Sequence, residues 1–535
     1  MTELPASLKA NPLLAQWLSI LPDGRVEVRS GKVELGQGIT TALAQIVAGE
    51  LDVAVYRIAM VRASTACGPN EGFTSGSLSV QDSGSALRQV CAEARAIYLR
   101  AAARRLEVAV ADLEVRDGEI AVRGVPGVRI SYWELADPAL LQRAADGQAA
   151  PRPPAAASED VERIDLPAKV LGQPAFLHDL ALPGMLHARI AHPPSPGATL
   201  LEVDAASVET LPGVVRVLRE GSFLAVVGRG EHEATRALRK LKAVARWRES
   251  ETLPDVNDLG TFLRSQPVET SIVDEKTSAQ AQPAVRSFAA SYSRPFLAHA
   301  SIGPSCGVAR FDGGQLEVWT HAQGVYPMQK DLAVLLGLPA AAITVSHVPG
   351  AGCYGHNGAD DAAVDAAVIA HAMPGVPIRV LWTREDEMSH SPFGAAMVVD
   401  VRAGVDAQGR ICAWQHEIWS NGHSMRPGRM PVPVFHAAPL LDRGFAPQVS
   451  INVPVATGAG AERNAVPDYD FPQRKIVNHR LLAMPLRTSS LRSLGAHCNV
   501  FAAESLMDEI AGALGEDPLA FRLRHLSDAR AARCC

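Results

Sequence analysis

Residues 350–363 form a glycine-dense segment whose residue types suggest ligand chemistry directly. The segment begins Gly-Ala-Gly-Cys-Tyr-Gly-His-Asn-Gly and runs into an alanine-rich stretch that is expected to be a helix. Glycine lets backbone N–H groups approach a ligand closely, and the N-terminus of a helix adds a positive dipole end. Such a loop suits an anion or a large polar cofactor. Taken alone, the same pattern is also ordinary turn chemistry before a helix.

Two further loops rich in small residues favour the ligand-binding interpretation. Residues 31–38 read Gly-Lys-Val-Glu-Leu-Gly-Gln-Gly, and residues 71–79 read Glu-Gly-Phe-Thr-Ser-Gly-Ser-Leu-Ser. After the first loop, Thr40 and Thr41 open an apolar stretch that predicts a helix extending to about Glu50. Together the three loops favour a bound cofactor over turn chemistry.

Gln323 and Tyr354 are expected at the ends of neighbouring strands. The residues between them contain one predicted helix, 327–337, and one predicted strand, 343–348. Strands joined in this way end at the same edge of a sheet, where ligands of α/β folds bind. The amide of Gln323 can donate a hydrogen bond to a ligand oxygen there, and Gly355 leaves space for close backbone approach.

The alternation of predicted strands and helices sets the fold class. A hairpin over residues 15–29 and a long helix over about 83–106 come first. A small α/β module follows at residues 163–250, between polar, poorly periodic stretches at 147–160 and 251–284 that are expected to be linkers. The fold class is therefore expected to be α+β, or mixed α/β.

Composition excludes several classes of protein. The chain of 535 residues is long enough for roughly three domains, and its net charge of −6 comes with scattered Lys and Arg, so no nucleic-acid footprint is visible. No apolar run approaches the roughly 18 residues of a membrane span. The first five residues lack a basic region and twin arginines. We therefore expect no nucleic-acid partner, no membrane span and no export signal.

The eight cysteines are dispersed, and no two of them form a C-x-x-C pair. The chain therefore lacks the usual zinc, iron–sulfur and c-type haem motifs, and a reducing compartment with mostly inert thiols is expected. Asp360 and Asp361 are interpreted as stabilising a helix N-terminus rather than binding a metal. The scattered histidines are interpreted as structural: His187, His192, His299 and His347.

The segment from Thr320 to the glycine-rich loop resembles the large, molybdenum-binding subunit of the xanthine dehydrogenase/aldehyde oxidase family. Thr-His-Ala-Gln at 320–323, the helix, the strand and the loop match without a gap. In that family the glutamine faces the oxo ligand of molybdenum and an aromatic–glycine pair frames the metal, and these roles fall on Gln323, Tyr354 and Gly355. Tyr354 replaces the usual Phe, and Gly-His-Asn replaces the usual Gly-Gly-Lys. The resemblance implies that the pterin dithiolene, not a side chain, holds the metal.

Residues 33–41 resemble the pterin-binding loop of the family. On that resemblance Gly36 and Gly38 expose N–H groups, Gln37 binds edge groups of the pterin, and Thr41 or Thr40 caps a helix whose N-terminus attracts phosphate.

Two more segments carry the resemblance. Residues 75–79 resemble the small-residue loop that lines the cofactor, and the expected contacts are Ser75, Gly76, Ser77 and Ser79. Leu-Arg-Ser-Leu-Gly at 491–495 resembles the Phe-Arg-Gly-Phe-Gly segment of the family. Arg492 is therefore expected to be an active-site cation, with a solvated surface arginine as the alternative.

The order of the segments indicates one branch of the family. The pterin-type loop precedes the others, as it does in the isoquinoline 1-oxidoreductase and nicotinate dehydrogenase branch. The resemblance implies an N-terminal molybdopterin-binding module at residues 1–146 and a hammerhead-like α/β domain at 163–250. It implies a molybdopterin-binding domain at 275–535 that is incomplete at its C-terminus.

The resemblance also implies a function. The expected protein is the catalytic subunit of a heteromeric molybdenum hydroxylase that oxidises an N-heteroaromatic such as nicotinate or isoquinoline, with water as the oxygen source. The expected cofactor is the molybdenum cofactor, molybdopterin, in its cytosine dinucleotide form. Because this chain lacks iron–sulfur cysteines, the electrons are expected to leave through a small [2Fe–2S] subunit, with cytochrome c as a candidate acceptor. An aldehyde oxidoreductase subunit is the alternative. The expected location is the cytoplasm, with association to the inner membrane face through partners as a variant.

The general base of the family is a glutamate in a late Gly-Glu motif that has no counterpart here. Gly515-Glu516 lies between a predicted helix at 502–514 and a last predicted helix at 518–526, and it is interpreted as a helix junction. The chain thus resembles a truncated, split or frameshifted large subunit. We expect the isolated chain to be inactive, and a non-catalytic fragment or assembly protein stays open as a third interpretation.

Overall fold

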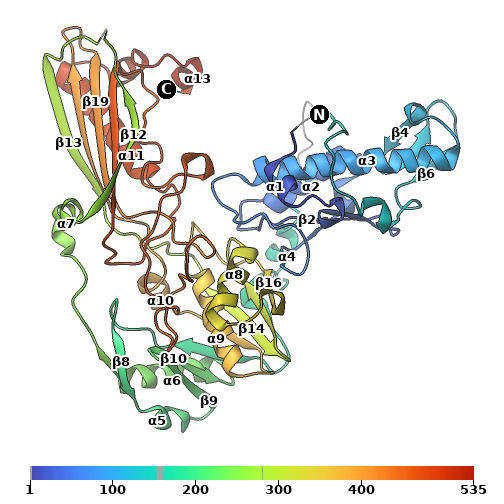
Figure 1. The fold of residues 1–535 in the computed structure, drawn as a ribbon, viewed down its shortest axis with the longest axis horizontal. Helices are drawn as coiled ribbons and strands as arrows, with labels where there is room; N and C mark the ends of the chain where they lie inside the picture. The colour runs from blue at the N-terminus through green and yellow to red at the C-terminus, as the bar shows by residue number, and fades with distance from the viewer. Residues whose placement is uncertain (1–2, 154–160, 280, 535) are drawn as a thin grey trace.

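The chain folds into three lobes, which a computed structural model describes over residues 3–153, 161–279 and 281–534 (Figure 1). The N-terminal lobe is blue in the figure. The central lobe combines green and yellow segments, and the C-terminal lobe contains a long sheet of green, orange and red strands. The mixture of helices and sheets confirms the predicted α+β class.

The N-terminal lobe is built on a small three-stranded sheet. The predicted hairpin is present as β1 (Leu18–Ile20) and β2 (Val26–Arg29), and β3 (Ile58–Val61) pairs with β2 in parallel. The connection from β2 to β3 contains α2 (Ile39–Leu51), and the long helix α3 (Ser85–Leu106) packs beside it. A second, antiparallel sheet completes the lobe: β4 (Leu113–Arg116), β5 (Glu119–Val122) and β6 (Arg129–Ser131).

The central lobe contains a mixed seven-stranded sheet in the order β16-β15-β14-β17-β7-β10-β9. Its strands come from both sides of residue 250, so the 163–250 module shares one sheet with the segment that follows. The boundaries of the three expected domains stay a prediction. The strands are β7 (Leu186–Ile190), β9 (Val214–Glu220), β10 (Phe223–Gly228), β14 (Cys306–Asp312), β15 (Gln315–Thr320), β16 (Ile343–His347) and β17 (Ile378–Leu381).

Helix α9 (Ala359–Ala372) is the central element packed against this sheet. Every residue from 359 to 370 is buried, and most are alanine or other small residues. Small apolar residues lie all around this helix, so it must be covered on all sides, and its three buried aspartates must find partners. Further helices of the lobe include α6 (Glu231–Val244), α8 (Val325–Leu336) and α10 (Arg384–Ser389).

The C-terminal lobe is a five-stranded sheet with the long helix α11 (Ala496–Leu514) packed against it (Figure 1). The strands, in sheet order, are β12 (Val268–Lys276), β20 (Gln473–Leu481), β19 (Ile411–Ser420), β18 (Met397–Val405) and β13 (Arg286–Arg294). In the core between the sheet and the helix, Trp414 of β19 stacks on Phe471, which precedes β20, with the ring centroids 4.8 Å apart.

Three predictions about elements were wrong. Residues 251–284 are not simply a linker, because they contain α7 (Leu259–Ser265) and strand β12. β12 lies at the sheet edge with mostly exposed polar side chains, so it lacks the apolar pattern that identifies a strand. The helix expected at 502–514 begins at Ala496. The helix expected to be the last, α12 (Pro518–Leu523), is followed by α13 (Ala529–Cys534).

The linker expected at 147–160 lies partly outside the described residues. Within the described part, Glu50 and Glu93 accept hydrogen bonds from backbone N–H groups of residues 146, 147 and 152. Among the described residues, no helix is long and apolar enough to cross a membrane.

The contact between α9 and β14 predicts a steric limit at Gly307. A Cβ atom at Gly307 would lie 2.3 Å from the Cα atom of Ala363 and 2.5 Å from the carbonyl oxygen of Ala362. We expect Gly307→Ala to lower the free energy of unfolding by about 1–3 kcal/mol through overpacking. Gly512→Ala is the matched control, because Gly512 is exposed in α11 with open space around it. That change should raise the free energy by about 0.5–1 kcal/mol. Equal effects of the two changes in urea unfolding would contradict this packing.

Candidate functional site

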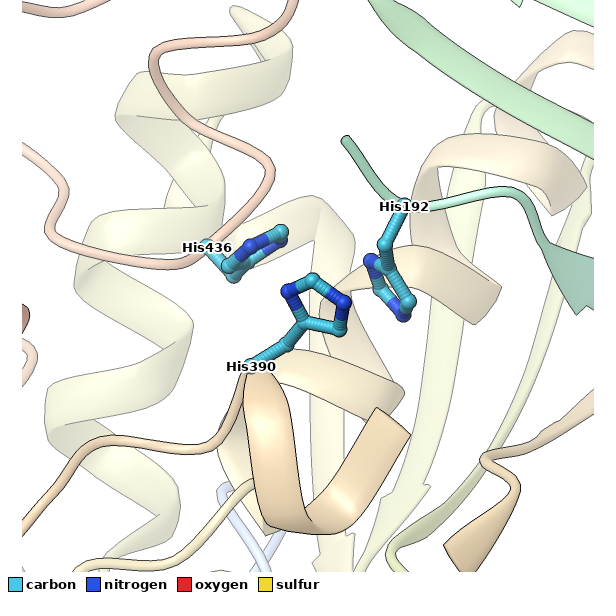
Figure 2. Close-up of side chains that lie close together, drawn as sticks. All are labelled: His192, His390 and His436. Atoms are coloured by element: carbon cyan, nitrogen blue, oxygen red, sulfur yellow. The ribbon is translucent and has the colours of Figure 1, made fainter. Parts of the chain in front are cut away.

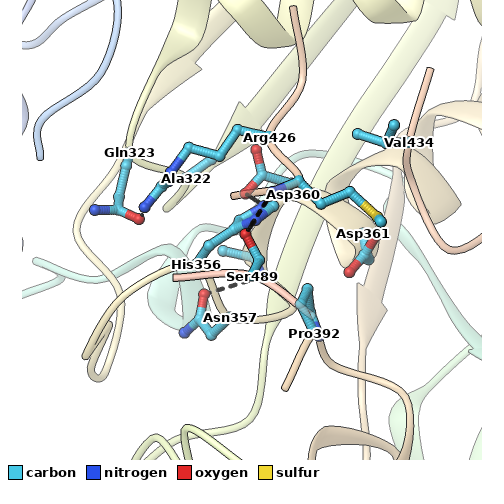
Figure 3. Close-up of polar contacts among 12 residues, drawn as sticks. Ala322, Gln323, His356, Asn357, Asp360, Asp361, Pro392, Arg426, Val434 and Ser489 are labelled. Carbon is cyan, nitrogen blue, oxygen red and sulfur yellow. Dashed lines mark hydrogen bonds and ion pairs between the residues drawn. The ribbon is translucent and has the colours of Figure 1, made fainter. Parts of the chain in front are cut away.

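Gln323 lies where the sequence places it, at the edge formed by the ends of two parallel strands. β15 and β16 are parallel neighbours that end at Thr320 and His347. Gln323 is only 7% exposed, and both ends of its amide are engaged. Its Nε2 donates to the carbonyl oxygen of Thr74 over 2.8 Å. Its Oε1 accepts from Nη1 of Arg426 over 2.7 Å, and Figure 3 shows how Gln323 and Arg426 lie. The orientation of the amide is therefore fixed.

Arg426 is a site residue that the sequence analysis missed. Its side chain is buried, and burial lowers the pKa of its guanidinium to about 10. Its guanidinium carbon lies 5.2 Å from the centroid of the Phe73 ring, and that of Arg429 lies 4.9 Å from the same ring. Burial also lowers the pKa of Arg429. Within the described residues, neither arginine forms an ion pair with a carboxylate, so the pair offers positive charge to an anion.

A histidine–aspartate pair lies beside Arg426 (Figure 3). Nε2 of His356 lies 3.1 Å from Oδ2 of Asp360, and Nδ1 of His356 lies 2.7 Å from Oγ of Ser489. Burial opposes the charge of Asp360, but His356 and Arg426 together hold the pKa of its carboxyl below the ordinary value. Asp360 is therefore a buried anion that is hydrogen-bonded to His356 and attracted by Arg426. Its role therefore goes beyond the stabilisation of the N-terminus of α9 that the sequence predicts.

The glycine-rich loop brings Tyr354, Gly355 and Arg492 together. Tyr354 adopts a left-handed conformation with φ of 59°. Its carbonyl oxygen accepts a hydrogen bond from the backbone N–H of Arg492 over 2.7 Å, and the Arg492 guanidinium lies 5.9 Å from its ring. A Cβ atom at Gly355 would lie 2.0 Å from the carbonyl oxygen of Ser490, so here the space left by Gly355 is used by the chain itself. Arg492 is exposed beside Tyr354.

The N–H groups of the predicted pterin loop face a carboxylate of their own chain. Glu34 is 7% exposed. It accepts hydrogen bonds from the backbone nitrogens of Gly36, Gly38 and Thr40 over 2.8, 3.0 and 3.1 Å. This carboxylate therefore occupies the anion position at the N-terminus of α2 that the sequence analysis assigned to a phosphate.

The side chains of the same loop are also engaged locally. Nε2 of Gln37 donates to the carbonyl oxygen of Val33, and Oε1 of Gln37 accepts from the backbone N–H of Leu35. Oγ1 of Thr41 accepts from the backbone N–H of Ile164. The cofactor roles expected for Gly36, Gln37, Gly38 and Thr41 stay predictions, and they require these groups to exchange their present partners.

Residues 75–79 come directly after Thr74, the residue that contacts Gln323. The N–H of Thr74 donates to the carbonyl oxygen of Gln323 over 2.9 Å, which closes a two-way link with the strand edge. Gly76 and Ser77 both have positive φ, and the loop packs against Thr457, whose carbonyl oxygen would lie 3.2 Å from a Cβ at Gly76. Ser75, Gly76 and Ser79 are half-buried and Ser77 is exposed. Their contacts with a cofactor stay predictions.

His347 joins the N-terminal lobe to the strand edge. Its Nε2 lies 3.1 Å from the carbonyl oxygen of Glu34, and its Nδ1 lies 3.1 Å from that of Ala322. Oγ1 of Thr74 also accepts from the backbone N–H of Val33 over 2.8 Å. The loops at 31–38 and 71–79 thus converge on the edge that carries Gln323. They do so through His347 and Thr74, with no hydrogen bond between Gln37 and Gln323 in the described residues.

A cleft of about 460 Å³ lies beside this convergence point. Its lining includes Phe73, Tyr326, Lys330 and Gly428. The volume falls within the range of small-molecule sites. Because Arg426 and Arg429 also lie against the Phe73 ring, the cleft adjoins the positive part of the site.

Gly515-Glu516 is a helix junction, as predicted. Gly515 ends α11 in the left-handed conformation with φ of 71°. The Glu516 carboxylate pairs with Arg524, and Asp517 caps α12 by accepting from the backbone N–H of Ala520. Glu516 therefore has a structural role at this junction.

Comparison with known proteins identifies the family to which this chain belongs. Residues 6–163 and 268–440 each match a molybdopterin cofactor-binding domain. The chain is 35% identical to a nicotinate dehydrogenase chain of Pseudomonas putida, over 97% of this chain and 43% of that protein. It is 28% identical to the beta chain of isoquinoline 1-oxidoreductase from Brevundimonas diminuta, over 96% of this chain and 70% of that protein. The chain thus spans less than half the length of the first of these relatives.

A solved structure supports the fold. The crystal structure of quinoline 2-oxidoreductase from Pseudomonas putida 86 matches with a TM-score of 0.54 at 16% identity, over 69% of this chain and 50% of that one. The chain belongs to the molybdopterin-binding large subunits of the xanthine dehydrogenase/aldehyde oxidase family, in the nicotinate dehydrogenase and isoquinoline 1-oxidoreductase branch. The two matched domains meet where Gln323 contacts Thr74.

The burial of His347 predicts an acid-sensitive lobe contact. Burial lowers the pKa of His347 to about 4, below the ordinary value of about 6.5. As the pH falls between these values, the unfolded chain gains a proton that the folded chain does not, so the free energy of unfolding falls. His347→Gln should remove about 1.4 kcal/mol per pH unit from this slope. Urea unfolding from about pH 7 to about pH 4 measures it, and identical slopes for both proteins would refute the assignment.

Proposed function

We propose that this chain holds a molybdenum cofactor, molybdopterin in its cytosine dinucleotide form, at the strand edge that carries Gln323. The supporting observation is the pair formed by the buried Arg426 and the half-buried Arg429, which lie against the same Phe73 ring. Neither forms a direct ion pair among the described residues, and the nearby anion Asp360 balances only one of the two positive charges. A buried charge without an ion-pair partner is costly. An anionic group of the cofactor offsets that cost, and the orientation of Gln323 is already fixed by Arg426 and Thr74.

The residues present fit such a group. When bound, the cofactor supplies the redox chemistry and the oxygen transfer. Arg426 and Arg429 would neutralise its negative charge, and the Phe73 ring would exclude water from both. Gln323 would present a preoriented amide to the reacting centre. Arg492, exposed beside Tyr354, would be the cation that meets the substrate.

The proposed reaction is hydroxylation of an N-heteroaromatic similar to nicotinate or isoquinoline. The names of the two curated relatives support this substrate class. An aldehyde is the alternative substrate, and turnover of aldehydes in preference to heteroaromatics by the assembled enzyme would favour it. The proposed electron partner is a small [2Fe–2S] subunit, with cytochrome c as a further acceptor. The proposed location is the cytoplasm, because the cysteines that the structure describes are unpaired thiols.

Arg426→Met tests the role of the buried charge. Methionine keeps the packing on Phe73 but removes the cation, so we expect the molybdenum content of the purified protein to fall at least roughly tenfold. The free energy of unfolding of the cofactor-free protein should change little. The change removes the desolvation cost of a buried guanidinium, and this offsets the lost hydrogen bond to Gln323 and the lost attraction to Asp360.

Arg246→Met is the matched control for this change. The Arg246 side chain is 73% exposed in its ion pair with Glu202, far along the chain from Arg426. Molybdenum and released cytidine nucleotide are measured per chain in both variants. Full cofactor content in Arg426→Met would overturn the proposed site.

A further inference from the structure

Three histidines from distant parts of the sequence meet in the central lobe (Figure 2). His192 follows β7, His390 follows α10, and His436 lies in the loop after β19. One ring nitrogen from each can be chosen so that all three atoms lie within 4.8 Å of one another. The His192 and His390 rings are stacked with their centroids 4.5 Å apart, and the His436 ring is nearly perpendicular to that of His192.

The cluster leaves buried polar atoms without partners. His192 is 6% exposed, and neither of its ring nitrogens has a hydrogen-bond partner among the described residues. Nδ1 of His436 also has no hydrogen-bond partner among the described residues. Buried polar groups are nearly always satisfied by a hydrogen bond, a water or an ion. An imidazole that is buried with both nitrogens free therefore requires an explanation beyond core packing.

A buried ion pair fixes the positions of two of the histidines. Arg487 forms a two-pronged contact with Asp361, whose Oδ1 also accepts from the backbone N–H of His436 over 2.7 Å. Nη2 of Arg487 donates in addition to the carbonyl oxygen of His390 over 3.0 Å. The backbone segments that carry His390 and His436 are thus held by one framework.

The charges around the cluster are balanced. Arg487 is paired with Asp361 at 2.6 Å, and Lys242 lies 3.6 Å from a carboxylate oxygen of Asp386. Burial lowers the pKa of His390 to about 4 and lowers those of His192 and His436 well below the ordinary value. All three imidazoles are therefore neutral near pH 7, which is the form that binds metal ions.

We propose that His192, His390 and His436 form a binding site for a divalent transition metal ion of the zinc class. Neutral imidazole is a preferred ligand of such ions, and three histidines with a water as the fourth ligand are a known zinc geometry. His390 and His436 are half-buried, so parts of both residues reach solvent. The ion would cross-link three segments that are remote in sequence around the buried ion pair. This site is separate from the strand edge at Gln323 where we propose the molybdenum cofactor, because the two share no residue.

Binding is expected to draw the rings together. Zinc–nitrogen bonds of about 2.0–2.1 Å place tetrahedral ligand atoms about 3.3 Å apart. The three ring nitrogens now lie up to 4.8 Å apart, so the side chains must rotate by a modest amount to bind the ion. The partly exposed His390 and His436 have the freedom to make them.

Titration of the full chain with Co²⁺ tests the proposal. The purified protein is first freed of metal with a chelator, and Co²⁺ binding is followed by its visible ligand-field absorption, with Zn²⁺ as competitor. We expect one Co²⁺ per chain, displaced by Zn²⁺. His390→Gln and His436→Gln should each weaken binding by at least about 10–100-fold. His232→Gln is the control, because His232 is an exposed residue on α6, and it should bind as the wild type does.

X-ray absorption of the zinc-loaded wild-type protein gives a test that does not depend on the folding of any variant. We expect about three imidazole nitrogens at about 2.0–2.1 Å. Failure of the wild type to bind Co²⁺ or Zn²⁺ would overturn the proposal. So would sulfur ligands in the absorption spectrum, or unchanged affinity in both histidine variants.

Discussion

Three carboxylates are buried in helix α9, and the centre of this molecule depends on how each of them is neutralised. Asp360, Asp361 and Asp365 lie in the first two turns, and each is at most 4% exposed. A buried carboxylate must be paired or protonated. Asp360 is paired with His356, and Asp361 with Arg487. Burial raises the pKa of Asp365 well above its ordinary value, and Nε1 of Trp382 donates to it.

Each pairing organises a different side of the helix. Asp360 faces the site, where its charge supports Arg426 and thereby the hydrogen bond that orients Gln323. Asp361 accepts from the backbone N–H of His436, and its partner Arg487 donates to the carbonyl oxygen of His390, so this pair holds two segments of the histidine cluster. Because the two aspartates are adjacent, a shift of the first turn of α9 would disturb both. Loss of one partner of a buried ion pair typically costs about 3–5 kcal/mol. The glycine-rich loop before α9 is therefore part of a charged framework as well as a ligand loop.

The parts of the site that sequence reasoning predicted are those set by chain topology. Gln323 had to lie at the strand edge because β15, α8 and β16 follow one another with short connections, and parallel pairing leaves their ends together. The loop at 31–38 was expected near the same ligand, and His347 does bring it to that edge. The pattern did not show that Glu34 would satisfy the N–H groups of this loop. A glutamate within a glycine-rich loop has the same sequence signal whether it points inward or outward.

The parts that were missed depend on contacts between distant segments. Arg426 lies in an irregular loop with no periodicity, and only the folded chain shows that it reaches Gln323. His192, His390 and His436 are too far apart in sequence to suggest a common site, so His192 was interpreted as structural. β12 was taken for part of a linker because an edge strand with polar side chains lacks the alternation that marks a strand.

The central claim is that the molybdenum cofactor binds at the edge formed by β15 and β16. A crystal of the cofactor-loaded chain, with diffraction recorded at the molybdenum absorption edge, tests it directly. The account predicts one anomalous peak beside the amide of Gln323, with density for an anionic group adjoining Arg426 and Arg429. A molybdenum peak remote from Gln323, or an anionic group bound away from both arginines, would contradict it.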